Sequence, residues 1–140
     1  MTQEKLKELT SSLSQKLRLG TVFVLPSFLP FKYSFSLSTA LKFIYISNRS
    51  MDRFTLYHEL GHIFFFTHRS LINKRKYEQF FMNPKEFVTG YAKTGPEEDF
   101  ADTFAIALAD VLKKDKTEYD SRYLTQKLAF VRGTIRKITH

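Results

Sequence analysis

The chain has 140 residues, 43% of them hydrophobic, which suits one domain with its own core and excludes a disordered chain. It contains no cysteine, which excludes disulfide bonds and cysteine-ligated zinc, so a bound metal would need histidine and carboxylate ligands. The net charge of +8 permits nucleic acid or an anionic surface as partner, but the basic residues are scattered, and a solvated basic surface is the simpler interpretation.

Neither a signal peptide nor a membrane span is predicted. The first residues, Met1 to Lys5, begin no apolar stretch, and no apolar run approaches the roughly 18 residues that a membrane helix needs. We therefore expect a cytoplasmic protein with a single domain over residues 1–140. A processed fragment of a longer precursor, or a protein exported by a non-classical route, would show the same features.

The first half of the chain predicts one helix and three strands. Leucines at three-to-four spacing indicate an amphipathic helix over residues 3–19, with Gly20 as its C-cap. Three strands follow, over residues 21–25, 31–37 and 41–47. In the second strand aromatic and polar residues alternate, which predicts one buried aromatic face and one face in water. After the third strand, Ser50 or Asp52 can cap the next helix.

The second half of the chain is predicted to be helical. A helix over about residues 51–66 is apolar around most of its circumference, so it should be buried. Gly61 within it costs stability relative to alanine, which either a close approach by another backbone or by substrate, or tight core packing, would explain. Three more helices are expected, over about 70–82, from Pro96 to about Lys114, and along the apolar stripe 124–138 after a cap at Asp120 or Ser121.

A motif for metal chemistry lies in the buried helix, where residues 58–62 read His58-Glu59-Leu60-Gly61-His62. Histidines four positions apart lie on one face of a helix, so both rings can reach one metal ion, and Glu59 can reach a water on that ion. Zinc accepts such nitrogen ligands and lowers the pKa of its bound water toward neutrality. The motif therefore supplies two ligands and a general base, but it lacks a third ligand.

His68 is one candidate for the third ligand, because it would complete the longer pattern HExxHxxGxxH. However, Phe65 stands where that pattern has a glycine, and phenylalanine resists the positive φ of a sharp turn. If the helix continues, His68 points about 120° away from His62. A surface histidine at the helix end is the alternative.

Glu98 together with Asp102 is the second candidate. Four residues apart on a helix, these carboxylates share a face. Glu98 could bind the metal, and Asp102 could accept the N–H of a ligand histidine's other ring nitrogen and so fix its tautomer. Glu97 is a rival ligand, but its neighbour four positions on is Ala101.

With these residues the sequence resembles the gluzincin peptidases, in which HExxH is followed by a ligand glutamate on a later helix. The stretch 91–105 resembles the corresponding segment of Pro-Pro endopeptidases and of the anthrax lethal factor catalytic domain, which reads approximately Y-x-x-T-N-x-x-E-[FY]-F-A-E-x-F. The resemblance implies that Glu98 is the zinc-binding glutamate, that Asp102 supports a ligand histidine and that Tyr91 supports the oxyanion. The chain departs from the pattern with Gly95 for asparagine, Asp99 for an aromatic residue and Asp102 for glutamate.

The resemblance also implies a fold and an activity. The fold would be α+β and zincin-like, with a small, mostly antiparallel twisted sheet packed on the HExxH helix, a glutamate helix and a C-terminal helix. The activity would be that of a zinc-dependent endopeptidase with one Zn²⁺ per chain, in which Glu59 is the general base for hydrolysis of a peptide or protein. Residues 41–47 would then be the sheet edge on which an extended substrate pairs.

Two other hypotheses remain open at this point. The chain could be a regulatory or binding module built around a zinc site, which recognises a DNA-associated protein. It could also be a latent peptidase whose cleft is blocked by the N-terminal or the C-terminal helix. Substrate preference and oligomeric state do not follow from the sequence, because shared ligands do not define a specificity pocket.

Overall fold

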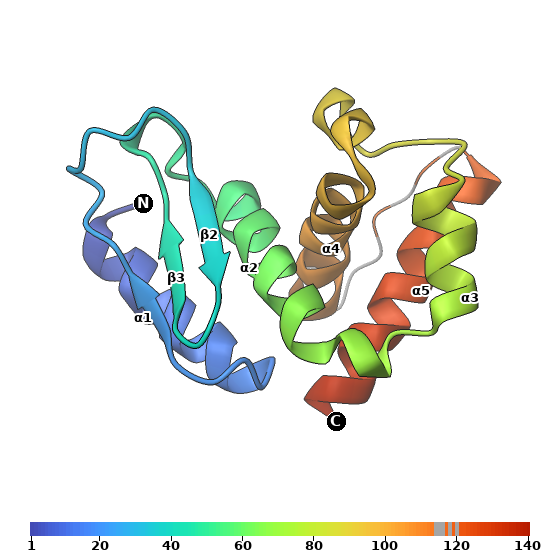
Figure 1. Cartoon of the computed structure of the whole chain (residues 1–140), viewed down its shortest axis with the longest axis horizontal. Coiled ribbons are helices and arrows are strands. Elements are labelled where there is room, and N and C mark those ends of the chain that lie inside the picture. Colours follow the sequence, from blue (N-terminus) through green and yellow to red (C-terminus); the bar gives the residue numbers. More distant parts are fainter. Residues whose placement is uncertain (114–116, 118, 120) are drawn as a thin grey trace.

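The computed structural model describes residues 1–113, 117, 119 and 121–140, which form a small α+β fold. The helices are α1 (Gln3–Lys16), α2 (Arg53–His68), α3 (Lys74–Tyr77), α4 (Pro96–Lys113) and α5 (Arg122–Thr139), and the strands are β1 (Val22–Val24), β2 (Phe35–Ser38) and β3 (Lys42–Tyr45). Helix α2 lies between the sheet on one side and α4 on the other (Figure 1). None of the described helices has the length and apolar character needed to cross a membrane.

Side-chain caps fix where the later helices begin. The Asp52 carboxylate accepts a hydrogen bond from the Thr55 N–H at 2.7 Å, so Asp52 rather than Ser50 caps α2. Ser121 caps α5 by accepting from the N–H of Leu124. The alternative cap Asp120 and the predicted helix end at Lys114 lie outside the described residues.

The predicted basic helix over 70–82 forms only in part. A 3-10 turn, Arg69–Leu71, follows α2 directly, and Asn73 then caps α3 by accepting from the Lys76 N–H. The helix continues as a π-helical segment, Glu78–Met82. The end predicted near Asn83 is confirmed.

Helix α1 ends earlier than predicted, and Gly20 is not its cap. The helix stops at Lys16, and Arg18 adopts the left-handed conformation, with φ 53°. The N–H of Leu19 then bonds back to the Ser14 carbonyl at 2.8 Å, which satisfies the open end of the helix. Leu19 is fully buried, so anchoring of this turn in the core ends the helix before Gly20.

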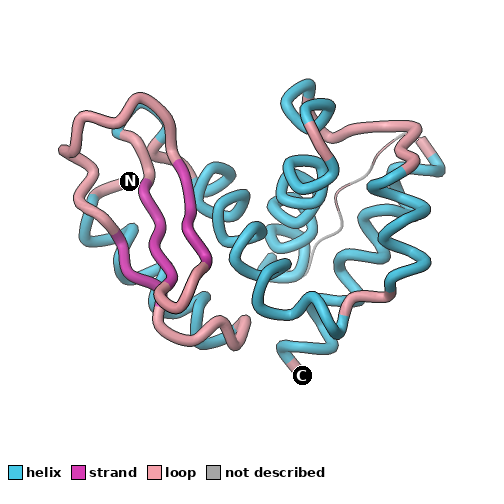
Figure 2. Tube along the Cα trace, viewed as in Figure 1, coloured by secondary structure: helices cyan, strands magenta, loops and turns pink. Residues whose placement is uncertain are grey.

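The sheet is mixed, which corrects the prediction of a mostly antiparallel sheet. Its three strands lie side by side (Figure 2) in the order β1-β3-β2. Strand β1 is parallel and β2 antiparallel to β3. The loop after β1 carries the chain to the far edge, and β3 then inserts between the two earlier strands. The prediction that residues 41–47 form the sheet edge is therefore wrong, because β3 is central and the edges are β1 and β2.

Strand β2 also differs from its prediction, since it is shorter and the face that it turns toward α2 is polar. It covers only Phe35–Ser38, and Leu37 is 51% exposed. Ser36 pairs with the buried Ile44, so both point toward α2, whereas Leu37 points outward. Sequence alternation alone does not show which face of a strand packs on the core. The serine that this strand presents to α2, Ser36, donates a hydrogen bond to the buried carboxylate of Glu59.

Close packing of α2 on α4 explains the glycine in the buried helix. A Cβ atom at Gly61 would lie 3.0 Å from Cδ1 of Phe104 and 3.1 Å from Cα of Ala101. Both distances are shorter than normal van der Waals contact, so tight core packing is the reason for Gly61. As predicted, α2 is largely buried. The close approach brings the first turn of α4 within side-chain reach of the histidines on α2.

Candidate metal centre

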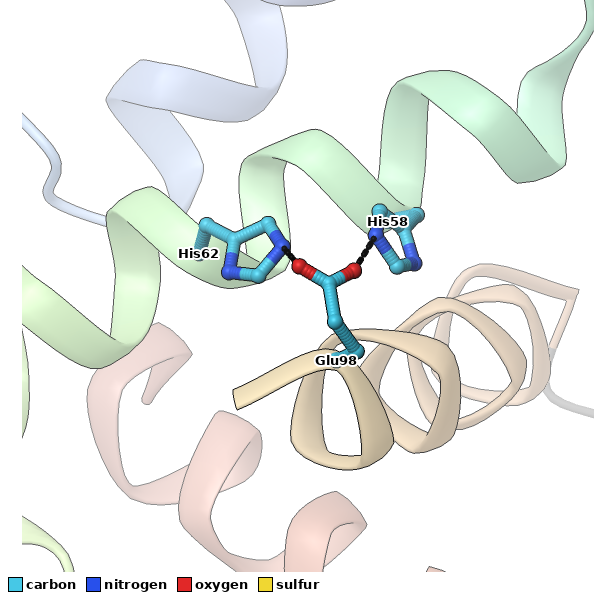
Figure 3. Close-up of side chains that lie close together, drawn as sticks. All are labelled: His58, His62 and Glu98. Carbon is cyan, nitrogen blue, oxygen red and sulfur yellow. Dashed lines mark hydrogen bonds and ion pairs between the residues drawn. The ribbon is translucent and has the colours of Figure 1, made fainter. Parts of the chain in front are cut away.

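The two histidines of the motif and the predicted glutamate come together in the structure. His58 and His62 project from successive turns of α2 toward Glu98 on the first turn of α4 (Figure 3). One carboxylate oxygen of Glu98 lies 3.0 Å from Nε2 of His58, and the other lies 2.9 Å from Nε2 of His62. One potential ligand atom from each residue lies within 4.8 Å of the others. Two imidazole nitrogens and one carboxylate oxygen form a donor set that fits zinc.

Asp102 lies behind the site and orients His58. Its Oδ1 is 2.7 Å from Nδ1 of His58, and it is also hydrogen-bonded by the Thr89 hydroxyl. When Nδ1–H donates to Asp102, the lone pair of Nε2 is free to bind a metal. Burial alone would lower the pKa of His58, but the hydrogen bond to Asp102 and the negative charges of Glu59, Asp102 and Glu98 raise it above its ordinary value.

Burial makes the other histidine and the predicted general base favour their uncharged forms. The pKa of His62 is lowered, mainly by burial, against the opposing effect of the Glu98 charge. The pKa of Glu59 is raised to about 7, again mainly by burial. A general base with a pKa near neutrality can both accept and return a proton at physiological pH.

Ser36 is a site residue that the sequence reasoning did not identify. Its hydroxyl donates to Oε1 of Glu59 at 3.0 Å and so holds the carboxylate in place. The sequence signal is the alternation of Ser34 and Ser36 with aromatic residues in the strand predicted over 31–37, which predicts that these serines face water, and Ser38 follows that strand. These three serines instead line a cleft of about 470 Å³ that also contains Glu59.

Tyr91 lies at the mouth of the same cleft, on the 3-10 turn Gly90–Thr94. Its ring centroid is 6.0 Å from that of His58, and the side chain is 59% exposed. Its pKa is raised by burial and then by the negative charge of Glu98, so the hydroxyl keeps its proton. Tyr91 is therefore a hydrogen-bond donor beside His58.

His68, the rival third ligand, lies outside the group of potential ligands. Helix α2 continues through position 65 without the turn that would bring His68 back. The alternative interpretation, a surface histidine, is wrong, because His68 is only 9% exposed. Its Nε2–H donates to the Leu17 carbonyl at 2.8 Å, and its ring packs on Phe64. His68 thus ties the end of α2 to the end of α1.

Removing the carboxylate behind His58 should weaken zinc binding without abolishing it. In the Asp102→Asn variant the histidine loses its charged partner, and we expect zinc affinity to fall about 10- to 100-fold. Competition with a chromophoric chelator measures this change. Thr89→Val is the matched control, since it removes only a hydrogen bond to Asp102, and it should lower affinity less than Asp102→Asn. An unchanged affinity in Asp102→Asn would contradict the orienting role.

Comparisons of the sequence and the structure with protein-family models, curated proteins and solved structures find no match for this chain. The resemblance to gluzincins therefore stays a prediction based on the site residues.

Proposed function

We propose that the chain is a zinc-dependent endopeptidase with His58, His62 and Glu98 as its metal ligands. The observation that supports this most directly is the position of Glu98 between the two histidines. One of its carboxylate oxygens lies 3.0 Å from Nε2 of His58, and the other lies 2.9 Å from Nε2 of His62. Asp102 behind His58 and Glu59 beside it complete the set of groups that hydrolysis at such a site requires.

Each side chain of the site has a role in the proposed reaction. A bound zinc ion would supply a Lewis acid that lowers the pKa of a water and polarises the scissile carbonyl. Glu59 takes the proton of the attacking water and passes it to the amine that leaves as the C–N bond breaks. The hydroxyl of Tyr91 donates to the oxygen on which negative charge develops. Ser36 positions Glu59 by donating to its carboxylate.

The shape of the cleft favours an extended polypeptide as substrate. The edge strand β2 forms one wall, in the place where the sequence suggested residues 41–47. Phe65 and Phe66 of α2 form part of the opposite wall. A strand edge offers backbone groups to any extended chain, so it binds peptides with little dependence on their side chains. The described lining residues come from β2 and its approach, α2 and its end, α4 and Tyr91, and none belongs to a terminal helix that would block the cleft.

Zinc uptake should release protons and weaken as the pH falls. The raised pKa of His58 means that this histidine carries more protons near neutral pH than a free histidine does, and a ligand nitrogen must lose its proton. We expect the apparent zinc affinity to fall about tenfold per pH unit once the pH drops below the raised pKa of His58, and more steeply at lower pH, where His62 also takes up a proton. Titration calorimetry in buffers of different ionisation enthalpy measures the protons released. Uptake without proton release would contradict this protonation scheme.

Replacing Tyr91 with phenylalanine should reduce turnover more than substrate binding. The lost hydroxyl acts on the developing oxyanion, so we expect kcat to fall about 10- to 1000-fold with little change in KM. Tyr33, which is 71% exposed and does not line the cleft, gives a matched control, since Tyr33→Phe should leave both constants unchanged. Equal kinetics for Tyr91→Phe and the wild type would remove Tyr91 from the mechanism.

Metal analysis combined with peptide-library cleavage tests the proposed function. The purified chain should bind one zinc ion per molecule, cleave casein or members of a peptide library, and lose activity when a chelator removes the metal. His62→Ala should bind zinc far more weakly and show no cleavage. Failure to take up zinc on titration would overturn the metal centre. Zinc uptake without cleavage of any library member would favour the regulatory or binding module instead.

A further inference from the structure

A second groove lies along the other edge of the sheet, away from the candidate metal centre. Strand β1 and α1 with the turn that follows it line this groove, which has a volume of about 600 Å³. Lys7 and Ser11 of α1 and Arg18 in the turn after it line the groove together with residues of β1. The groove shares no lining residue with the cleft of the metal centre.

The backbone of β1 presents unpaired hydrogen-bonding groups to this groove. The N–H of Leu25 donates to the Ile44 carbonyl at 2.9 Å, so it points toward β3. Because backbone groups alternate along a strand, those of Phe23 also face β3, whereas those of Val22 and Val24 point the other way. Strand β1 has no further strand on that side within the described part of the chain. The edge is therefore open to another extended chain.

The side chains that line the groove carry positive charge only. Lys7 and Arg18 stand near its two ends, and no acidic side chain lines it. The helix from Lys7 to its end at Lys16 is about 14 Å long, which equals about four residues of extended chain, and Arg18 follows in the turn after the helix. Between these cations lies Ser14, which is 3% exposed and whose hydroxyl has no hydrogen-bond partner in the structure. A buried hydroxyl without a partner is costly, and it points to a polar ligand in this groove.

We infer that this groove binds an extended acidic peptide segment, which adds a strand to the free edge of β1. Val22 and Val24 exchange backbone hydrogen bonds with the segment, and Lys7 and Arg18 pair with carboxylates about five residues apart on it. A peptide suits the edge better than a nucleic acid because the strand offers donors and acceptors in alternation, which another peptide backbone matches. The inference does not depend on the proposed peptidase activity, since the groove has its own lining and its test measures binding.

Fluorescence anisotropy with a labelled peptide tests the charge pairing. The probe is the hexapeptide Glu-Val-Thr-Val-Thr-Glu, added to the full chain with EDTA present to prevent cleavage. We expect saturable binding that weakens at least tenfold when glutamine replaces both glutamates, and at least tenfold in Lys7→Glu/Arg18→Glu. The control Lys5→Glu/Lys16→Glu makes the same change in net charge on α1 outside the groove, and it should lose less than threefold. Equal losses in the two double variants would overturn the inference.

Backbone substitutions test strand addition separately from charge. N-methylation of alternate residues of the probe should abolish binding in one set of positions and spare it in the other, because only one set faces β1. On the protein, Val24→Pro removes one outward N–H from an edge strand that tolerates proline, and binding should fall at least tenfold. Equal binding by all N-methylated probes would overturn strand addition. So would an oligonucleotide that binds as tightly as the peptide with the same dependence on Lys7 and Arg18.

Discussion

The Glu59→Gln variant should lose about 10³-fold in kcat/KM while it keeps one zinc ion per chain. General base catalysis contributes about 10²- to 10⁴-fold, and glutamine cannot accept the proton of the attacking water. Glutamine has almost the same shape as glutamate, and its side-chain oxygen can still accept the hydrogen bond from Ser36. Glu59 is not among the three grouped ligands, so the metal content should not change.

Parallel measurements on Glu97→Gln give the control for this prediction. Glu97 lines the same cleft, but it does not belong to the group of potential ligands, so the identical chemical change there should alter kcat/KM less than threefold. Metal content by mass spectrometry and kinetics on one library-derived peptide complete the comparison. A Glu59→Gln variant with near-normal turnover would exclude Glu59 as the base. A variant that loses zinc would make Glu59 a structural part of the metal site.

The part of the site that lies on a single helix could be predicted from the sequence. The spacing of His58 and His62 fixes their common face once the segment is helical, and the buried character of that segment was also predictable. The i, i+4 spacing of Glu98 and Asp102 put two carboxylates on one face of a second helix. The packing of α2 on α4 then brought both pairs together. The sequence also predicts that His68 points away from His62 if the helix continues past Phe65, and the helix does continue there.

The parts that depend on contacts between distant segments could not be predicted. A strand's alternation gives two faces but does not say which one is buried, so the sequence predicts Ser36 in water, whereas its hydroxyl donates to Glu59. Strand order depends on where a loop carries the chain, and the sequence alone does not show that β3 lies between β1 and β2. The burial of His68 follows from the Leu17 carbonyl, which lies 51 residues earlier in the chain.

Asp99, a departure from the gluzincin pattern, is explained by a buried lysine of α5. Nζ of Lys127 lies 2.7 Å from both carboxylate oxygens of Asp99 and also donates to the Glu86 carbonyl at 2.9 Å. Both side chains of the pair are almost fully buried. Burial raises the pKa of Asp99 to about 6 and lowers the pKa of Lys127, so each charge depends on its partner. Asp99 directly follows Glu98, and the pair thus ties the first turn of α4 to α5.

Lys127→Met should therefore destabilise the fold by about 3–5 kcal/mol, because it leaves the Asp99 carboxylate buried without a partner. Urea denaturation of the zinc-free chain measures this loss. The double variant Lys127→Met/Asp99→Leu should recover most of it, since apolar residues of similar volume replace a buried ion pair at little cost. Full stability in Lys127→Met alone would contradict the dependence of Asp99 on this lysine.

A second ion pair between the same two helices provides a control that distinguishes an effect on stability from an effect on metal binding. Nη1 of Arg132 donates to Oδ2 of Asp110 at 3.2 Å, eleven residues along α4 from Asp99 and about 16 Å from the first turn. Arg132→Met should also destabilise the fold, but it should leave zinc affinity within threefold of the wild type. Lys127→Met should lower zinc affinity at least tenfold even where the chain is folded, because it loosens the turn that carries Glu98. If the two variants lose zinc affinity equally, the effect is one of general stability. If only Lys127→Met loses it, the buried lysine of α5 positions the third ligand.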